Sequence, residues 1–201
     1  MSIDLGVGIL PDAKTREMAI RLSRALGEKY RTSYTLGHSY HPHVTLYQAT
    51  FQDYATLLNS IGKIRHLSLT GIQLEPEDLV VTPSNYIFIR YAKTPELEEL
   101  QSNVINSVAS SRLKGVPTIW DKNKVALSPE KAIAVQQWGF VEAFETFDPH
   151  LTIGRITDDN MDCNEVLSLL SGIYENIDFM PIELVTYELG ADGGCLNPRK
   201  I

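Results

Sequence analysis

The pattern His-x-Thr occurs twice in the sequence, in two stretches of similar composition. Residues 41–46 read His-Pro-His-Val-Thr-Leu, and residues 148–153 read Asp-Pro-His-Leu-Thr-Ile, so the motif histidines stand 107 positions apart. The β-branched and aliphatic residues of both stretches predict strands. Because side chains alternate across a strand, His43 and Thr45 share one face, as do His150 and Thr152. If the two strands lie side by side, two imidazoles and two hydroxyls meet in one small volume, so the repeat constrains the whole fold.

The order of the predicted elements also repeats approximately. Strands are predicted at 3–10, 43–47, 66–74, 85–91, 150–155 and 182–189, and helices at 12–30, 52–61, 94–113, 128–144 and 163–171. This order predicts an α+β fold of two related helix–strand lobes within a single unit spanning 1–201. The lobes are expected to share one sheet or two abutting sheets. Residues 114–146 have no counterpart in the first half and are interpreted as an insertion, whose Trp120 and Trp138 should serve as core or cover residues.

The net charge and the cysteine count narrow the classes of partner. The chain has 25 acidic and 18 basic residues, for a net charge of −7, which disfavours extended contact with a nucleic acid but is compatible with a small nucleotide in a local cationic pocket. Cys163 and Cys195 are too few for a disulfide framework or a zinc site. No apolar run reaches the ~20 residues needed to cross a bilayer, and the N-terminus lacks a signal peptide. We therefore expect a cytoplasmic, monomeric protein with no membrane partner.

The four motif side chains suit acid–base chemistry on a phosphate. Histidine titrates nearest to neutrality, so one neutral ring can take a proton from a nucleophile while one protonated ring gives a proton to a leaving oxygen. The hydroxyls of Thr45 and Thr152 project onto the same faces and can donate hydrogen bonds to non-bridging oxygens. We therefore predict that His43 and His150 are catalytic and that the two threonines bind the substrate.

Two further residues are predicted to contact the substrate. Arg155 stands three residues after Thr152 and could add a bidentate contact to a phosphate. Strict alternation would place Arg155 on the opposite face from Thr152, so this contact requires a bulge or a strand end at Gly154. Tyr47 shares the predicted face of His43 and Thr45, and is the preferred candidate for stacking on a base. The other aromatic candidates more often pack in a core or a rim: Tyr40, Tyr86, Phe88 and Trp120.

A metal site is the main alternative interpretation of the histidines. His41 and His43 share a face and would need Asp148 or His150 as a partner, but a clear carboxylate cluster is missing from the sequence. The simpler interpretation places His41 in a loop beside the site. The sequence also lacks a Gly-x-Ser-x-Gly nucleophile elbow, a Gly-x-x-x-x-Gly-Lys phosphate loop and a Gly-x-Gly-x-x-Gly fingerprint. Two other histidines are expected at or near the surface: His38 and His66.

The two motif strands resemble the signature of the two-histidine (2H) phosphoesterase superfamily, which includes bacterial RNA 2′,3′-cyclic phosphodiesterases and 2′-5′ RNA ligase-like proteins. That signature consists of two His-x-[Ser/Thr]-x motifs, each on a strand after proline or another helix-terminating residue, and residues 43–46 and 150–153 fit it in full. The second motif of the family commonly continues to an arginine, as Gly154-Arg155 does here. The similarity in element order covers nearly the whole chain outside 114–146.

The resemblance implies a bilobal fold with pseudo-twofold symmetry and an active-site cleft between antiparallel sheets. It also implies cleavage of a phosphodiester without a metal or a cofactor, commonly the opening of a 2′,3′-cyclic phosphate to a monoester. By the same resemblance His43 and His150 act as general base and general acid, in an order that the sequence leaves open, while Thr45 and Thr152 hold phosphate oxygens.

The length of the chain and its acidic balance favour small substrates within this class. The insertion precedes the second motif and could cover one end of the cleft, so nucleotides and short oligonucleotides are expected in preference to RNA of tRNA size. The alternatives on the same fold are a protein that binds nucleotides or RNA ends, a 2′-5′ RNA ligase-like activity, and an enzyme that cleaves cyclic oligonucleotides.

Overall fold

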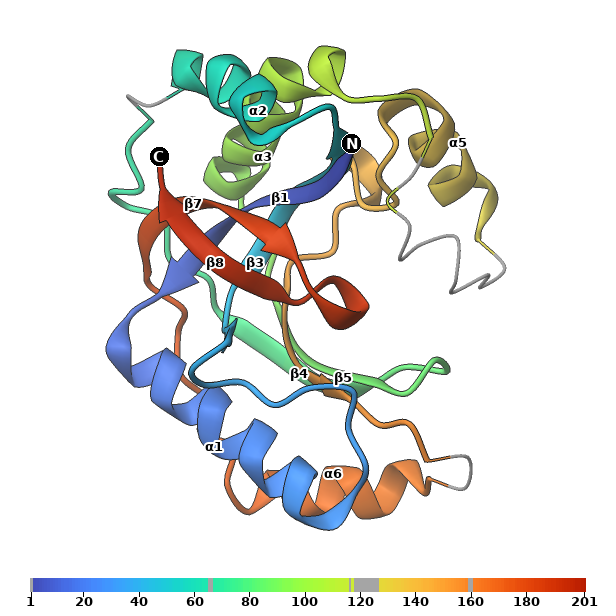
Figure 1. The fold of residues 1–201 in the computed structure, drawn as a ribbon. Coiled ribbons are helices and arrows are strands. Elements are labelled where there is room, and N and C mark those ends of the chain that lie inside the picture. The colour runs from blue at the N-terminus through green and yellow to red at the C-terminus, as the bar shows by residue number, and fades with distance from the viewer. Residues whose placement is uncertain (1, 65–66, 116, 118–126, 159–160) are drawn as a thin grey trace.

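In a computed structural model of the protein, the strands form one continuous antiparallel sheet (Figure 1). The structure describes residues 2–64, 67–115, 117, 127–158 and 161–201. The strands are β1 (Ile3–Pro11), β2 (Tyr40–His41), β3 (Val44–Phe51), β4 (Pro76–Val81), β5 (Tyr86–Tyr91), β6 (His150–Arg155), β7 (Pro181–Leu189) and β8 (Cys195–Lys200). Their order across the sheet is β2-β8-β7-β1-β3-β6-β5-β4, which places the two motif strands, β3 and β6, side by side.

The sheet is built from two copies of one β-α-β-α-β unit. The helices are α1 (Ala13–Lys29), α2 (Tyr54–Ile61), α3 (Pro95–Val108), α5 (Pro129–Trp138) and α6 (Cys163–Ser171). The first unit is β1-α1-β3-α2-β4 and the second is β5-α3-β6-α6-β7. Each unit gives its last strand to the other half of the sheet, because β4 pairs with β5 and β7 pairs with β1. The two units meet at β3 and β6, as the repeated motif predicts.

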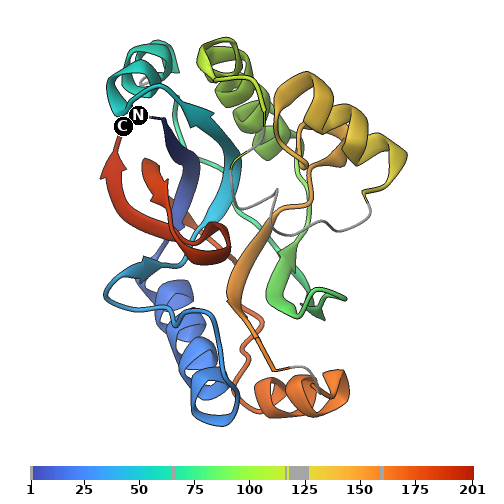
Figure 2. The same ribbon diagram turned by 45° about the vertical axis from the view of Figure 1, so that its right-hand side comes forward.

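The helices cover the sheet in two pairs at opposite ends of the molecule (Figures 1 and 2). Helices α2 and α3 contact each other and β3, whereas α1 contacts β6 and α6, and α6 contacts β4. Each unit thus places its first helix over the motif strand of the other unit. One large core fills the space between these helices and the face of the sheet that bears Val44 and Leu151, both fully buried. The opposite face of β3 and β6 carries the motif histidines and threonines.

Local sequence signals explain where the helices begin. The side chain of Asp12 accepts hydrogen bonds from the backbone N–H groups of Lys14 and Thr15, and so caps α1. The hydroxyl of Thr94 caps α3 in the same way, with Pro95 at the first helical position. On the inner side of α1, apolar residues at helical spacing are buried: Met18, Leu22 and Leu26.

The structure corrects three of the predicted elements. The strand predicted at 66–74 is absent from the described part of that range, where Gly71 has a φ of +86° and Leu74 makes only an isolated bridge to Phe179. Strand β4 forms two residues later instead. The helix predicted at 128–144 ends at Trp138, because Gly139 adopts the left-handed conformation that closes helices. The helix predicted at 94–113 likewise ends as an α-helix at Val108.

The inserted segment packs onto the first motif strand. Trp138, at the end of α5, stacks at an angle on Phe144 with ring centroids 4.8 Å apart, and its carbonyl oxygen accepts a hydrogen bond from Tyr47. Trp138 is partly buried against the core, which agrees with the prediction that it is a core or cover residue. Trp120 lies outside the described residues, so its predicted role remains a prediction.

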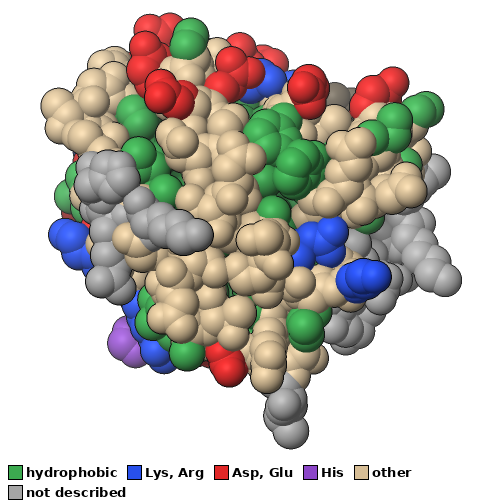
Figure 3. All heavy atoms as spheres, turned by 90° about the horizontal axis from the view of Figure 1, so that it is seen from above, with side chains coloured by type: hydrophobic (Ala, Val, Ile, Leu, Met, Phe, Trp, Pro, Cys, Tyr) green, Lys and Arg blue, Asp and Glu red, His purple; other side chains and the backbone are tan. Residues whose placement is uncertain are grey.

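The helices and one face of the described surface can be compared with the hydropathy and the charge of the sequence. None of the described helices is long and apolar enough to cross a membrane. Figure 3 looks down on α2, α3 and α5, and shows acidic side chains gathered along one edge of this face. That arrangement agrees with the net charge of −7.

Candidate active site

The two motif strands pair through one residue of each motif. Val44 of β3 lies opposite Leu151 of β6 in an antiparallel register. Continuing this register by one residue on either side places His43 opposite Thr152, and Thr45 opposite His150. Because alternate side chains point to opposite faces, all four project on the side away from the helices. We call this side of β3 and β6 the motif face.

A β-bulge follows the threonine of each motif. In β3, Thr45 lies opposite Gly8 of β1 and Tyr47 lies opposite Val7, so Leu46 is the extra residue. In β6, Thr152 lies opposite Phe88 of β5 and Gly154 lies opposite Ile87, so Ile153 is the extra residue. A bulge of this kind puts two residues against one and reverses the alternation beyond it. The repeat therefore includes a matched pair of bulges that single-strand periodicity does not reveal.

The bulge in β6 turns Arg155 onto the motif face. Arg155 lies opposite Tyr86, which shares a face with Phe88 and therefore with Thr152. The contact predicted for Arg155 required such a bulge at Gly154, and the structure has it one residue earlier. By the same geometry Gln48, three residues after Thr45, lies on the motif face in β3 and is the counterpart of Arg155.

The bulge in β3 turns Tyr47 away from the motif face, which corrects the prediction that Tyr47 stacks on a base. The Tyr47 side chain is 0% exposed and packs edge-on against Phe140, with ring centroids 5.6 Å apart. Its hydroxyl donates to the Trp138 carbonyl oxygen at 2.6 Å. Tyr47 thus anchors the inserted segment to the sheet. The prediction failed because the extra residue at Leu46 reverses the alternation of side chains on which it relied.

His43 is a buried, neutral histidine. Its residue is 8% exposed, and its ring packs edge-on against Tyr187 with centroids 4.8 Å apart. Burial lowers the pKa of His43 from 6.5 to about 4. The charges of His150 and His41 lower this pKa further, whereas a hydrogen bond to the His41 carbonyl oxygen raises it. That bond, 3.0 Å long, is made by Nδ1. In the neutral ring Nδ1 therefore carries the proton, and Nε2 is left as a base.

His150 has the same backbone contact but different neighbours. Its Nδ1 donates to the Asp148 carbonyl oxygen at 2.7 Å. The ring lies against Phe88, with centroids 4.4 Å apart. A carboxylate oxygen of Glu142 lies 3.9 Å from Nδ1, and the two side chains are 13% and 19% exposed. In each histidine of the repeat a backbone carbonyl oxygen accepts from Nδ1 and so sets the tautomer. Among the contacts of the described residues, only His150 faces a carboxylate.

A short hydrogen-bond chain supports Thr45. Its hydroxyl lies 3.1 Å from the hydroxyl of Tyr187, which accepts from the Gln48 amide at 3.0 Å. Burial raises the pKa of Tyr187, so the phenol stays protonated. Since the Tyr187 oxygen accepts from Gln48, its proton can go to Thr45, which leaves the Thr45 proton for a substrate oxygen. Thr152 lies opposite Phe88 of β5.

Arg155 holds the turn between β7 and β8 against the motif face. Its Nη1 lies 2.8 Å from Asp192 Oδ1, and its Nε donates to the Ser84 carbonyl oxygen at 3.2 Å. The guanidinium carbon lies 5.2 Å from the centre of the Tyr86 ring. On the other side Gln48 donates to the Gly193 carbonyl oxygen at 3.2 Å. The turn is therefore bound to both halves of the repeat.

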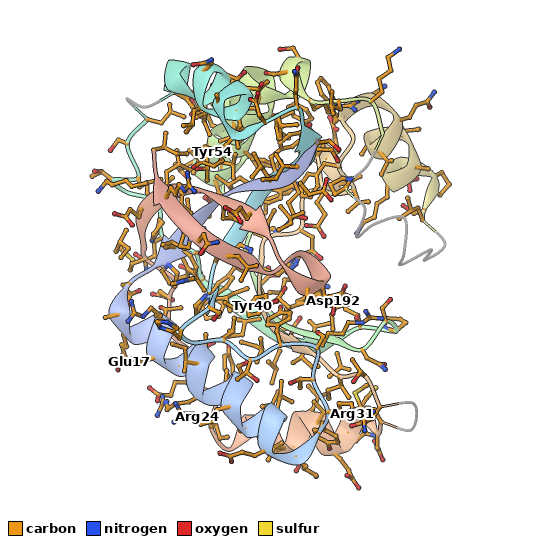
Figure 4. All side chains as sticks on the ribbon, in the orientation of Figure 1. Glu17, Arg24, Arg31, Tyr40, Tyr54 and Asp192 are labelled. Carbon is orange, nitrogen blue, oxygen red and sulfur yellow. The ribbon has the colours of Figure 1, made fainter. Side chains whose placement is uncertain are left out.

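Tyr40 also contacts this turn, and Figure 4 labels it near Asp192. The Tyr40 hydroxyl accepts from the Ala191 backbone at 3.2 Å, and its ring stacks on Tyr34 at 4.6 Å. Among the other aromatic candidates, Tyr86 lies beneath Arg155 and Phe88 lies against His150, so both pack on site residues. Trp120, the last of the aromatic candidates, lies outside the described residues, and so does His66.

The other predicted residues lie at the edge of the site or away from it. His41 pairs with Cys195 across β2 and β8, and His38 is exposed. Within the described part of the chain, no group of three or more His, Cys, Asp or Glu side chains is placed to hold a metal ion. A surface hollow of about 410 Å³ lies along α1, where Figure 4 labels Glu17 and Arg24, and contains no motif residue.

Three residues of the site were not found from the sequence. Gln48 carried a usable signal, because its spacing from Thr45 equals that of Arg155 from Thr152. Tyr187 comes from β7, far along the chain, and its pattern resembles that of any buried strand. Glu142 lies in the insertion, where no periodicity relates it to either motif.

Comparisons with known proteins identify the fold. No protein-family model and no curated protein sequence matches the chain. The structure is similar to a crystal structure of a phosphoesterase, with a TM-score of 0.60, 15% identity, and coverage of 100% of this chain and 97% of that one. It is also similar to the E. coli protein LigT in complex with NADP⁺, with a TM-score of 0.57, 16% identity, and coverage of 98% and 95%. The chain thus has the α+β fold of two related halves that its resemblance to the two-histidine phosphoesterases predicts, but the halves share one continuous sheet where the resemblance implied a cleft between two sheets.

Proposed function

We propose that the chain is a phosphodiesterase of the two-histidine type that opens a 2′,3′-cyclic phosphate, or a related nucleotide phosphodiester, to a phosphomonoester. The observation that supports this most strongly is the register at Val44 and Leu151, which brings His43, Thr45 and their counterparts in β6 onto one face. Matched bulges then add one polar side chain from each strand, Gln48 and Arg155. A tetrahedral anion between two imidazoles and two hydroxyls is the ligand that this set suits best.

The proposed reaction needs two proton transfers at phosphorus. One histidine Nε2 takes a proton from water as the water oxygen bonds to phosphorus. The other histidine gives a proton from Nε2 to the ribose oxygen as its bond to phosphorus breaks. Thr45 and Thr152 donate to the non-bridging oxygens, whose charge grows in the transition state. Water is added in sum, and the protons return through solvent.

The net charge and one of the comparisons support the proposed class of substrate. LigT is in complex with NADP⁺, so a protein with this fold holds a nucleotide. The acidic balance of the present chain disfavours a long phosphate backbone. Both observations favour a nucleotide or a short oligonucleotide as the substrate. Both catalytic roles are filled by imidazoles, so the proposed chemistry requires no metal ion.

The test is turnover of a substrate panel, with products identified by phosphorus NMR. The panel holds 2′,3′-cyclic mononucleotides, short RNAs with a cyclic-phosphate end and cyclic oligonucleotides, each assayed with and without excess chelator. His43→Ala and His150→Ala should each reduce the rate by about 10²–10⁴ while nucleotide binding persists. His38→Ala, at an exposed histidine outside the motifs, is the matched control and should leave turnover unchanged.

Three results would contradict the proposal. Wild-type turnover in both motif variants would exclude acid–base catalysis by these rings. Loss of activity in chelator would revive the metal interpretation. Binding of nucleotides without turnover of any member of the panel would favour a binding protein on the same fold.

A further inference from the structure

The turn between β7 and β8, residues 190–194, is packed closely onto the residues around the motif face. The ring of Tyr40 lies so near the turn that a Cβ on Gly194 would be 2.7 Å from it. The Tyr40 hydroxyl accepts from a backbone N–H of the turn at 3.2 Å, and the Gln48 amide donates to one of its carbonyl oxygens at 3.2 Å. These contacts fix the position of the residue at the centre of the turn, Asp192 (Figure 4).

The carboxylate of Asp192 is held beside Arg155. Its Oδ1 lies 2.8 Å from Nη1 of Arg155 and also accepts from the Tyr86 hydroxyl at 3.4 Å. The side chains of Asp192 and Arg155 are 12% and 29% exposed, so the ion pair is screened less than one in open solvent. Asp192 has a φ of +52°, in the left-handed region that few residues other than Gly, Asn and Asp adopt. The turn therefore presents this carboxylate in one defined place.

Arg155 retains donors for a substrate phosphate while it is paired with Asp192. Beyond the bulge in β6, Arg155 follows Thr152 by two positions of the partner strand, or roughly 7 Å, a distance that an arginine side chain spans. Among the described residues, the guanidinium binds the Ser84 carbonyl oxygen through Nε and Asp192 through Nη1. The Nη2 donors are left for a ligand. An anion bound there meets the cation and the neighbouring carboxylate together, so its net attraction is reduced.

Two further observations limit the positive charge around the phosphate position. Gln48, the counterpart of Arg155 in β3, is a neutral amide, and burial lowers the pKa of His43 to about 4, which leaves this ring uncharged at neutral pH. Arg90 lies opposite the second motif histidine in β5, and its Nε is 3.1 Å from a carboxylate oxygen of Asp148. Both of these arginines, Arg90 and Arg155, are thus paired with a carboxylate.

The substrate and the product of the proposed reaction differ in charge. A phosphodiester carries one negative charge, whereas a phosphomonoester carries about −1.5 to −2 at neutral pH, because its second pKa is near 6. The energy of a charge pair grows with the product of the two charges. An arginine without a carboxylate beside it would therefore hold the monoester product more tightly than the diester substrate.

We propose that Asp192 is a specificity-determining residue that sets the charge preference of the phosphate site. By offsetting the charge of Arg155, it weakens the binding of a doubly charged monoester more than that of a singly charged diester. This inference rests on the proposed function and adds to it a means by which the product leaves. It also predicts that substrates with a terminal phosphomonoester beside Arg155 are disfavoured.

The test compares two ligands that differ by about one charge. A 2′-deoxynucleoside 3′-phosphate and its methyl ester both lack the 2′-hydroxyl needed to form a cyclic phosphate. Each is titrated by calorimetry at about pH 7.5 into the wild type, Asp192→Asn, Asp192→Gly and Glu175→Gln. Asn and Gly both adopt the left-handed conformation, so the two Asp192 variants preserve the turn. Glu175 forms an exposed ion pair with Arg21 of α1, and Glu175→Gln removes the same charge away from the motif face.

Asp192→Asn should bind the methyl ester about threefold more tightly and the monoester about tenfold more tightly, because the lost charge acts about twice as strongly on a dianion. Asp192→Gly should show the same order of effects, and Glu175→Gln should match the wild type. In turnover of a 2′,3′-cyclic nucleotide, the monoester product should inhibit Asp192→Asn about threefold more strongly relative to KM, which is the ratio of the two gains.

The two proposals fail in different ways. Equal gains for both ligands would overturn the charge preference assigned to Asp192. Weaker binding of both ligands to the two Asp192 variants would also overturn it, and would show that the carboxylate orients Arg155 for the phosphate. If neither ligand binds any of these proteins, there is no phosphate site for Asp192 to control. A wild type that turns over no member of the substrate panel would contradict the proposed function, while the ratio of the two affinities still decides the role of Asp192.

Discussion

The burial of a neutral His43 makes the stability of the protein depend on pH in a defined window. In the unfolded chain His43 takes up a proton near pH 6.5, whereas in the folded protein burial lowers its pKa to about 4. The folded state therefore binds fewer protons than the unfolded state between these values, and stability falls as the pH falls. The contribution is fully present above about pH 6.5 and is lost progressively down to about pH 4.

The size of this effect follows from the shift. Each pKa unit corresponds to about 1.4 kcal/mol, so a shift from 6.5 to about 4 corresponds to about 3 kcal/mol of unfolding free energy. This is a large fraction of the ~5–15 kcal/mol that stabilises a typical domain. This contribution can be measured, because a variant without the His43 ring lacks its part of the pH dependence of the unfolding free energy and keeps that of all other groups.

The assay is urea unfolding at a series of pH values from 7.5 to about 4 for the wild type, His43→Gln and His38→Gln. The wild type should lose about 3 kcal/mol more than His43→Gln over this range, whatever the stability of each at neutral pH. His38 is exposed, so His38→Gln should follow the wild type. If the curves for the wild type and His43→Gln run parallel, His43 is not held neutral by burial, and the neutral ring described for the site is wrong.

Three further predictions concern the motif face. An aryl phosphodiester has a leaving oxygen that needs little protonation, so the alanine variant of the acid histidine should lose less rate on it than on a cyclic nucleotide, while the variant of the base loses as much on both. Equal losses on both substrates in His43→Ala and in His150→Ala would argue against paired acid–base catalysis. Asp192 holds Nη1 of Arg155. Asp192→Asn should free the guanidinium for the substrate and lower the KM for a phosphodiester several-fold, whereas Arg155→Ala should raise this KM about tenfold. An unchanged KM in both variants would show that Arg155 does not contact the phosphate. A Cβ at Gly6 would lie 2.2 Å from the Tyr187 ring. Gly6→Ala should therefore lower the free energy of unfolding in urea by about 1–3 kcal/mol and also lower kcat/KM. Tyr187→Phe should lower kcat/KM with a smaller loss of stability.

Sequence periodicity predicted the motif face because alternation is a local property of a strand. The position of His43 and Thr45 relative to each other depends only on the two peptide units between them. The pairing of β3 with β6 followed from the repeat itself. Tyr47 was misplaced because its orientation depends on a bulge at Leu46, and that bulge arises from the register with β1. Register between distant strands is a tertiary property, which no periodicity within 43–47 encodes.

The duplication explains the symmetry of the site, and the segments outside it explain the chemistry. Both motifs have the same strand, the same carbonyl contact at Nδ1 and the same bulge, so on these grounds the two histidines are equivalent. An acid–base pair must differ in protonation, so the parts of the chain that the repeat does not share are where such a difference can arise. Glu142 arrives from the insertion to face His150. On the side of His43, the absence of a side chain at Gly6 leaves room for the Tyr187 ring. In the other half of the repeat, the position equivalent to Gly6 is occupied by Tyr86. A symmetric fold thus supplies two matched positions around a phosphate, and unmatched neighbours give the two rings different surroundings.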